Sequence, residues 1–322
     1  MDVYPLHFRP ILKPKIWGGQ KLKELLHKST PEENTGESWE ISAVPPDVST
    51  LDNGPLKGWA LTALTKTFGK ELVGEKVYAQ HGAIFPLLFK FIDAKENLSL
   101  QVHPNDVLAK KRHNAMGKTE LWYILQADPG AGIYVGFRKG ATKEEYLERL
   151  HRGNLQDLMN FIPVHAGDAF LIEAGLVHAI GEGVLLAEIQ QSSDITYRVF
   201  DWNRVDEKGQ SRQLHTELAT DAIDFSMQSS ALPYDKNLKN SFQNLMKSSF
   251  FHCNFGRFTK DYKMDFKGLD SFVVLMCVGG EAKVTVEGKS ACLKVGSTLL
   301  LPAAVRAAFF QTQNVDLLQI TA

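Results

Sequence analysis

The chain is dominated by short runs of apolar and β-branched residues that are separated by Gly, Pro, Asn and Asp. The runs cover residues 86–92, 98–103, 121–127, 133–137, 168–174, 184–190, 195–200, 271–278, 282–288, 291–296 and 297–303. Strands of this length with turn residues between them favour a barrel or a sandwich over a parallel βαβ sheet. The sequence therefore predicts a mainly β fold.

Helical patterns occupy a smaller part of the chain. Apolar residues recur every three or four positions in residues 20–28 and 58–78, which is typical of a helix with one buried face. Thr142 followed by Glu145 resembles a capping box and predicts a helix that Gly153 weakens. These segments predict short helical insertions between the strands.

A polar interval that tends toward helix, residues 215–246, separates the first group of strands from the second. We place the domain boundary inside it, which gives a first domain of residues 1–235 and a second domain of residues 236–322. The length of 322 residues fits one large domain or two ordinary domains of roughly 100–200 residues each.

A weak internal repeat relates the two groups of strands at an offset of 129 residues. The first copy contains Gly167, Glu173, Gly175 and His178, and the second contains Gly296, Pro302, Ala304 and Ala307. An offset this long is too large for a solenoid and fits duplication of a small β-domain. If His178 binds a metal ion, the second domain has lost its metal, because alanine stands in the matching place.

The charge composition excludes some classes of partner. The chain has 36 basic and 37 acidic residues and a net charge of −1, which argues against nucleic acid or an anionic membrane surface. No stretch reaches 18 apolar residues, and the first residues lack the apolar segment of a signal peptide. Cys253, Cys277 and Cys292 lie in apolar surroundings and are expected to be reduced, buried thiols of a cytoplasmic protein. The sequence does not determine the oligomeric state.

Four side chains with metal-ligating atoms form the strongest chemical pattern. Gln101 and His103 lie two residues apart in one predicted strand and therefore point to the same face. Glu120 stands at the start of another strand, and His178 follows the turn at Gly175. Taken singly, each is more often a structural residue. Together, two imidazoles and a carboxylate form a donor set that suits zinc or Fe(II).

Longer motifs carry a resemblance to a known family. They cover residues 16–19 (IWGG), 36–40 (GESWE), 86–106, 117–125 and 167–204. These segments resemble the short bacterial form of the type I mannose-6-phosphate isomerases, and the resemblance extends from about residue 10 to about residue 215. It implies two cupin-like β-barrels of the jelly-roll type and one zinc ion (Zn2+) per chain. The implied reaction interconverts mannose 6-phosphate and fructose 6-phosphate.

The resemblance also implies roles for individual residues. It makes Gln101, His103, Glu120 and His178 the zinc ligands and places Arg198 in the active site. The general cupin pattern has His-x-His where this chain has Gln101 and His103. The isomerases depart from the cupin pattern at this place in the same way. A glutamate, Glu173, replaces the usual cupin proline and touches no expected ligand.

Aldose–ketose isomerisation moves a proton between two carbons through an enediolate, which requires a base, a stabilised oxyanion and a phosphate anchor. We expect Lys118 or Glu188 to relay the proton and Arg198 to stabilise the enediolate. Lys118, Arg198 and Trp17 are the expected substrate-binding residues. The structural alternatives are a solvated Lys118, a Glu188 paired with Arg198 and a Trp17 buried only for packing.

Two other functions remain open from the residues alone. A cupin-type Fe(II) oxygenase uses the same two-histidine, one-carboxylate set. A non-catalytic sugar-phosphate-binding cupin would retain the fold with a vestigial site. In the two hypotheses that involve a sugar, the isomerase and the non-catalytic cupin, the partner is a small sugar phosphate. Lys90 lies in the strand before the metal-ligating hairpin and is a further candidate for the pocket wall, whereas Asp194 is expected to hold a turn or Arg198.

Overall fold

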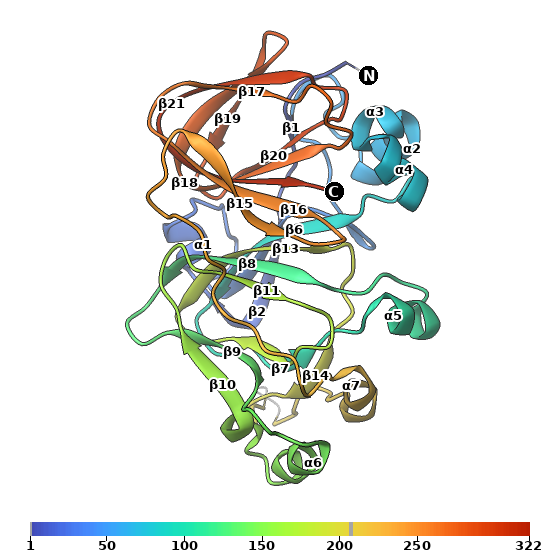
Figure 1. The fold of residues 1–322 in the computed structure, drawn as a ribbon, viewed down its shortest axis with the longest axis vertical. Coiled ribbons are helices and arrows are strands. Elements are labelled where there is room, and N and C mark those ends of the chain that lie inside the picture. The colour runs from blue at the N-terminus through green and yellow to red at the C-terminus, as the bar shows by residue number, and fades with distance from the viewer. Residues whose placement is uncertain (1, 206–208) are drawn as a thin grey trace.

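The structure is a computed structural model that describes residues 2–205 and 209–322. It is built mainly from antiparallel strands, which confirms the predicted fold class (Figure 1). The strands form two stacked groups, and the helices lie at the periphery of these groups. Within the described residues, no helix is both long and apolar enough to cross a membrane.

The N-terminal half contains two antiparallel sheets that face each other. The larger has the order β11-β8-β13-β6-β2-β3, with β2 Ile11–Gly19, β3 Thr35–Ile41, β6 Leu87–Ala94, β8 Glu120–Ala127, β11 Ala169–Ile172 and β13 Val184–Gln191. The smaller has the order β10-β9-β12-β7-β14, with β7 Leu100–Val102, β9 Gly132–Phe137, β10 Met159–Pro163, β12 His178–Ile180 and β14 Tyr197–Phe200. One apolar cluster, which includes Trp17, Trp122 and Ile180, takes side chains from both sheets.

The C-terminal half is one eight-stranded sheet with the central order β1-β20-β18-β21-β16-β15. Its strands are β1 Leu6–His7, β15 Ser241–Lys247, β16 His252–Phe258, β17 Tyr262–Asp265, β18 Val273–Val286, β19 Lys289–Lys294, β20 Thr298–Leu301 and β21 Ala307–Thr321. The short strand β1 comes from the N-terminal end of the chain and pairs with β20. A separate ribbon joins β4 Ala43–Val44 and β5 Asp47–Val48.

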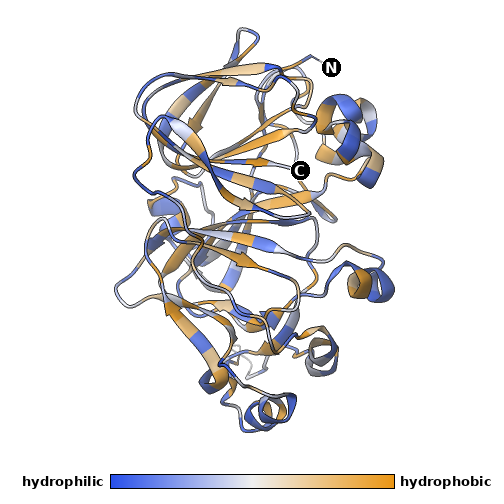
Figure 2. Cartoon of the chain, viewed as in Figure 1, coloured by the Kyte–Doolittle hydropathy of each residue, from blue (hydrophilic) through white to orange (hydrophobic). Residues whose placement is uncertain are grey.

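A second apolar cluster joins the two halves (Figure 2). Phe89 and Tyr123 belong to the outer face of the larger N-terminal sheet, and Phe255 and Leu318 belong to the C-terminal sheet. The rings of Tyr123 and Phe255 stack at 5.8 Å between centroids. Because both faces of β6 and β13 are covered, these strands carry apolar residues on both faces instead of strict alternation, and Lys90 and Glu188 interrupt the apolar runs.

Strand order supports the internal repeat. The order β11-β8-β13-β6 in the first half matches β20-β18-β21-β16 in the second. His178 begins β12 and Ala307 begins β21, as the offset of 129 residues requires. Ile172 lies opposite Glu120, and its counterpart Leu301 lies opposite Val273. Apolar Val273 and Ala307 therefore occupy the places of Glu120 and His178.

The helices are short. They are α1 Lys21–Glu24, α2 Leu61–Phe68, α3 Lys70–Val73, α4 Glu75–His81, α5 Asp106–His113, α6 Lys143–His151 and α7 Thr216–Ala222, with a 3₁₀ turn at Leu155–Leu158. The predicted helix over residues 58–78 is divided because Gly69 and Gly74 adopt positive φ angles. The capping prediction is confirmed, since the Thr142 hydroxyl accepts the Glu145 N–H at 3.2 Å.

Other predictions need correction or stay open. The interval 215–246 is helical only in α7, and β15 begins at its end. The three cysteines are free, but Cys292 is exposed, so the prediction of burial is wrong for that residue. The domain boundary between residues 235 and 236 stays a prediction.

Helices α3 and α4 contact the C-terminal half, where the Asp270 carboxylate accepts the N–H groups of Glu75 and Lys76.

Candidate metal centre

The smaller N-terminal sheet presents one row of polar side chains to the interior. His178 of β12 lies opposite Gln101 of β7, and Arg198 of β14 lies opposite Gln101 on the other side. His103 follows β7 immediately and shares a face with Gln101, as expected for residues two apart in extended chain. Antiparallel pairing thus brings together residues that lie almost a hundred positions apart.

The larger sheet supplies a second row. Glu188 of β13 lies opposite Lys90 of β6 and opposite Trp122 of β8. Lys90 in turn lies opposite Trp39 of β3. Glu120 opens β8 two residues before Trp122 and therefore points to the same face. The two rows meet between the sheets.

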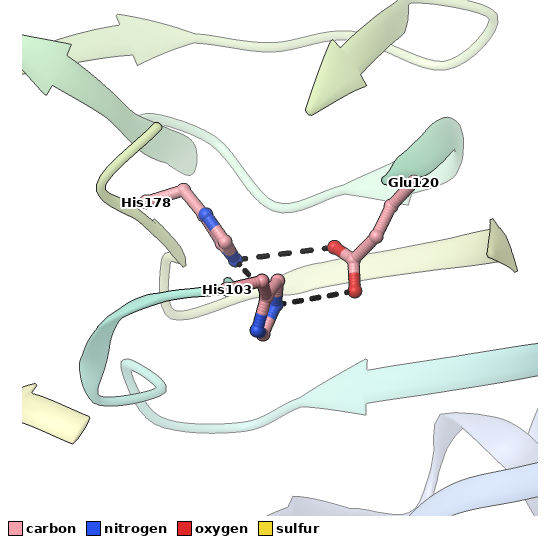
Figure 3. Close-up of side chains that lie close together, drawn as sticks. All are labelled: His103, Glu120 and His178. Carbon is pink, nitrogen blue, oxygen red and sulfur yellow. Dashed lines mark hydrogen bonds and ion pairs between the residues drawn. The ribbon is translucent and has the colours of Figure 1, made fainter. Parts of the chain in front are cut away.

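His103, Glu120 and His178 form a compact donor cluster (Figure 3). One potential ligand atom from each residue lies within 4.8 Å of the others, and all three side chains are fully buried. Nε2 of His103 lies 3.1 Å from Nε2 of His178 and 3.3 Å from Oε1 of Glu120. Within the described residues, this is the one group of three or more His, Cys, Asp or Glu side chains that is arranged to hold a metal ion.

Hydrogen bonds determine which histidine nitrogens face the cluster. Nδ1 of His103 lies 3.1 Å from the carbonyl oxygen of Ile195, and Nδ1 of His178 lies 2.8 Å from that of Leu176. A carbonyl oxygen only accepts, so each Nδ1 carries the proton and donates. Each neutral ring then presents an unprotonated Nε2 to the other donors, which is the arrangement found in metal-binding histidines.

The charges in the cluster also fit a cation. Burial raises the pKa of Glu120, but the Lys118 charge beside it outweighs burial and holds this pKa well below its usual value. Burial lowers the pKa of His178, so this ring stays neutral. Two facing nitrogen lone pairs and an ionised carboxylate in a buried site favour an added positive charge, and the three residues therefore fit a divalent metal ion.

Gln101 and Lys118 lie directly beside the donor cluster. The Gln101 amide nitrogen donates to Nε2 of His178 at 3.3 Å. Nζ of Lys118 lies 2.7 Å from Oε1 of Glu120 and 3.2 Å from Nε2 of His103. Lys118 is buried, so the alternative of a solvated strand-end lysine is wrong.

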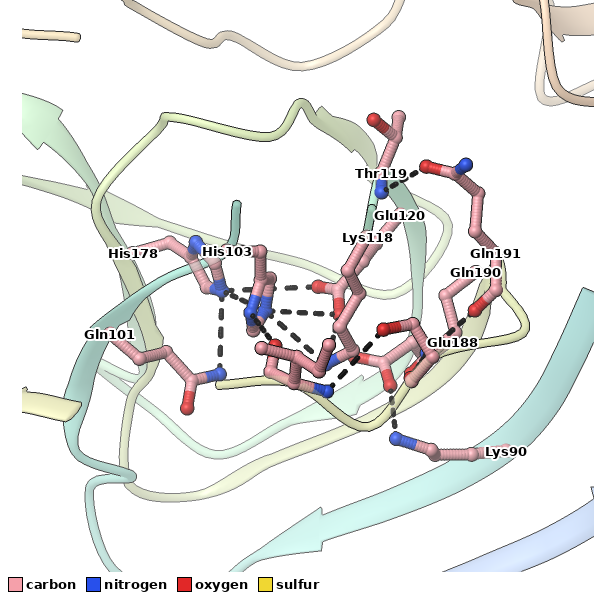
Figure 4. A network of polar contacts seen from close by, with 12 residues as sticks. Lys90, Gln101, His103, Lys118, Thr119, Glu120, His178, Glu188, Gln190 and Gln191 are labelled. Atoms are coloured by element: carbon pink, nitrogen blue, oxygen red, sulfur yellow. Dashed lines mark hydrogen bonds and ion pairs between the residues drawn. The ribbon is translucent and has the colours of Figure 1, made fainter. Parts of the chain in front are cut away.

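A second buried ion pair extends the network away from the donor cluster (Figure 4). Nζ of Lys90 lies 3.0 Å from Oε1 of Glu188, and the indole N–H of Trp122 donates to Oε2 of Glu188 at 2.9 Å. Burial lowers the pKa of Lys90, but the Glu188 and Glu37 carboxylates outweigh it and raise this pKa. Burial and the Glu120 charge raise the pKa of Glu188. Glu188 thus pairs with Lys90 and not with Arg198.

A cavity of about 280 Å³ adjoins these groups. Five cationic and three acidic side chains line it, which leaves an excess of positive charge. The lining residues are Lys15, Trp17, Glu37, Lys90, Ile92, Leu98, Ser99, Gln101, Lys118, Ile180, Glu188, Asp194, Thr196, Arg198 and Arg212. The volume is near the lower end of the roughly 300–1,000 Å³ that is usual for small-molecule sites.

All the expected substrate-binding residues line this cavity, as do Lys90 and Asp194. Trp17 is 4% exposed and also belongs to the apolar cluster between the sheets, so packing and a cavity wall are both part of its environment. His103, Glu120 and His178 lie behind the cavity wall, next to Lys118 and Gln101.

Sequence reasoning missed three charged residues of the cavity, Lys15, Glu37 and Arg212. Glu37 lies in the GESWE motif and accepts the indole N–H of Trp39 at 2.8 Å. The guanidinium of Arg212 donates to both carboxylate oxygens of Asp201, at 2.7 and 2.5 Å. The GESWE motif was a signal for Glu37, whereas no motif pointed to Arg212.

The neutral His103 predicts a pH-dependent stability. Burial and the Lys118 charge lower the pKa of His103 from 6.5 to about 3. As the pH falls below 6.5, the unfolded chain binds a proton that the folded chain does not, so the free energy of unfolding decreases. Between pH 7 and pH 5 the expected contribution of His103 to this decrease is about 2 kcal/mol.

Urea unfolding of the wild type and His103→Gln, with a chelator present, measures this contribution. The variant is expected to lose less stability than the wild type between pH 7 and pH 5. An equal loss in both proteins would show that His103 is not held neutral in the folded chain.

Comparison with known proteins agrees with this arrangement. The family model described as "Phosphomannose isomerase type I, catalytic domain" matches residues 6–125. The mannose-6-phosphate isomerase of Streptococcus mutans is 36% identical over 304 residues, which cover 94% of each protein. The Bacillus subtilis mannose-6-phosphate isomerase ManA is 33% identical over 307 residues and again covers 94% of each.

A solved structure matches over the whole chain. The crystal structure of the mannose 6-phosphate isomerase from Bacillus subtilis superimposes with a TM-score of 0.88 and 31% identity, and the match covers 99% of each chain. The identities above 30% over nearly the full length extend the relationship beyond the residues that the family model matches. The chain therefore belongs to the type I phosphomannose isomerase family and is an enzyme of the isomerase class.

Proposed function

We propose that this enzyme interconverts mannose 6-phosphate and fructose 6-phosphate through an enediolate, with one zinc ion per chain. The observation that carries the proposal is the buried cluster of His103, Glu120 and His178 beside a cavity with excess positive charge. The names of its relatives, which are mannose-6-phosphate isomerases, agree with this substrate.

Gln101, His103, Glu120 and His178 would hold the zinc ion. Gln101 offers an amide oxygen to the site after a half-turn of its amide group, whose nitrogen now lies 3.3 Å from His178. Zinc in catalytic sites has about three protein ligands and an open position. When bound, the ion acts as a Lewis acid that polarises a sugar oxygen.

The positive side chains of the cavity would anchor the phosphate group. We assign this role to Arg212, because Asp201 holds its guanidinium in a fixed bidentate geometry at the cavity wall. Arg198 would stabilise the enediolate oxygen, since a guanidinium stays protonated and donates two parallel hydrogen bonds. Trp17 would form an apolar wall against the sugar.

Glu188 and Lys118 are the candidates for proton transfer. Both line the cavity. A carboxyl group whose pKa is raised by burial is suited to both accept and release a proton near neutral pH, which favours Glu188 as the base. Lys118, next to Glu120, would donate to the sugar oxygen that gains negative charge.

We further propose that the chain divides into residues 1–235 and 236–322, that each part is a cupin-like barrel, and that the second binds no metal. The proposal for the second part rests on Val273 and Ala307, whose apolar side chains stand where the first part has Glu120 and His178.

A coupled assay of fructose 6-phosphate formation from mannose 6-phosphate tests the function. We expect activity with one zinc ion per chain, loss of activity after dialysis against a chelator, and recovery on adding zinc. Metal analysis and an oxygen electrode provide the control for the oxygenase. Stoichiometric iron with oxygen consumption, or a metal-loaded protein without isomerase activity, would contradict the proposal.

A further inference from the structure

His215 makes two hydrogen bonds to the backbone of Arg198. The backbone N–H of His215 donates to the carbonyl oxygen of Arg198 at 2.8 Å. Nδ1 of the His215 ring accepts the backbone N–H of Arg198 at 3.1 Å. A single residue therefore engages both backbone polar groups of Arg198, as a paired strand would.

This contact matters because of where Arg198 lies. Its strand, β14, is the terminal strand of the smaller N-terminal sheet, so Arg198 has a sheet neighbour only on the β7 side. The guanidinium is held by the same segment, since Nη1 donates to the carbonyl oxygen of Gln213 at 2.9 Å. Both the backbone and the side chain of Arg198 are therefore hydrogen-bonded to residues 213–215.

The His215 ring is not used to cap a helix. His215 is the N-cap residue of α7, a position where side chains commonly accept N–H groups from the first helical turn. Its side chain makes no capping hydrogen bond and contacts Arg198 instead. An accepting Nδ1 requires the neutral ring, and burial and the Arg198 charge lower the pKa of His215 in agreement.

We propose that His215 is a positioning residue that fixes the backbone of Arg198 and thereby the direction in which the guanidinium enters the cavity. The proposal rests on the proposed function, in which Arg198 stabilises the enediolate. A small displacement of such a group lowers the rate of the chemical step strongly while it changes substrate binding less. His215 would then affect kcat through Arg198 without contact to the substrate.

Two substitutions separate this role from general structural support. His215→Ala removes the acceptor, whereas His215→Asn places an amide oxygen at the same number of bonds from Cα as Nδ1. We expect kcat to fall about tenfold or more in His215→Ala and to stay within about threefold of wild type in His215→Asn. The neighbouring Leu214→Ala is the matched control, because Leu214 is an exposed side chain of the same segment.

A double-mutant cycle tests whether His215 acts through Arg198. In an Arg198→Ala background, His215→Ala is expected to reduce kcat no further, since the group that it positions is gone. An equal reduction in both backgrounds would overturn the proposal, as would equal losses in His215→Ala and His215→Asn with unchanged melting temperature and metal content.

Amide hydrogen exchange at Arg198 provides a readout that does not depend on activity. His215→Ala is expected to speed exchange of this amide about tenfold or more, and His215→Asn to leave it near the wild-type rate. Unchanged exchange in His215→Ala would overturn the proposal. A metal-loaded wild type that does not isomerise mannose 6-phosphate would refute the proposed function, and the exchange rates alone would then support or overturn the contact.

Discussion

Replacing His178 with alanine is expected to reduce bound metal from one ion per chain to a small fraction, and kcat/KM by at least about 10³-fold. The substitution removes one of the two histidine donors from a fully buried cluster and leaves a single imidazole, His103, beside Glu120 and Gln101 among the proposed ligands. A loss of 10³-fold corresponds to about 4 kcal/mol of transition-state stabilisation, which is within the range that a catalytic metal ion supplies. Metal analysis and the coupled assay measure the two effects on the same preparation.

His165→Ala is the matched control, because the His165 side chain is 84% exposed and its Nδ1 lies 3.8 Å from a carboxylate oxygen of Asp168, outside the donor cluster. It is expected to retain metal and activity. His178→Gln fills more of the space of the ring and separates metal loss from damage to the core, which circular dichroism and a thermal melt monitor. A folded His178→Ala protein with one tightly bound ion and wild-type activity would show that the cluster is not the metal centre.

Much of the fold could be predicted because local sequence signals and tertiary packing agree. The runs at residues 86–92 and 184–190 form β6 and β13, whose two covered faces favour apolar residues at most positions. The long strand β21 was not predicted, because the polar run at residues 311–314 interrupts its apolar residues and resembles turn sequence when it is read alone. Pairing with both β16 and β18 makes this segment a strand.

The site could also be predicted only in part, because pairing between strands and contacts between distant residues bring its side chains together. Gln101 and His103 are two apart in one strand, so their shared face follows from extended geometry. Arg212 shows no such pattern, because its place at the cavity depends on the bidentate contact with Asp201. Likewise, the structural alternative for Glu188 was a pair with Arg198, but the register between β13 and β6 puts Lys90 opposite it. Cross-strand neighbours are a property of register, which single-strand patterns do not contain.

Replacing Arg198 with alanine is expected to reduce kcat by about 10²–10³-fold while metal content stays at one ion per chain. Arg198 lines the cavity and lies opposite Gln101, but the donor atoms of the cluster come from other residues. Loss of a preorganised charge at the developing oxyanion raises the barrier of the chemical step and leaves the ligands intact. KM is expected to change less than kcat, because the interaction is made mainly in the transition state. Steady-state kinetics and metal analysis of the purified protein provide both values.

The pattern of kinetic changes identifies what Arg198 does. If KM rises while kcat is unchanged, Arg198 anchors the phosphate in both ground state and transition state, and the oxyanion role is wrong. If metal content falls together with kcat, Arg198 supports the donor cluster. Arg198→Lys is expected to recover only part of the lost rate, because an ammonium group restores the charge without the planar pair of donors. Arg152→Ala provides the matched control, since Arg152 is an exposed residue at the C-cap of α6 and pairs with Glu148, and it is expected to behave as wild type.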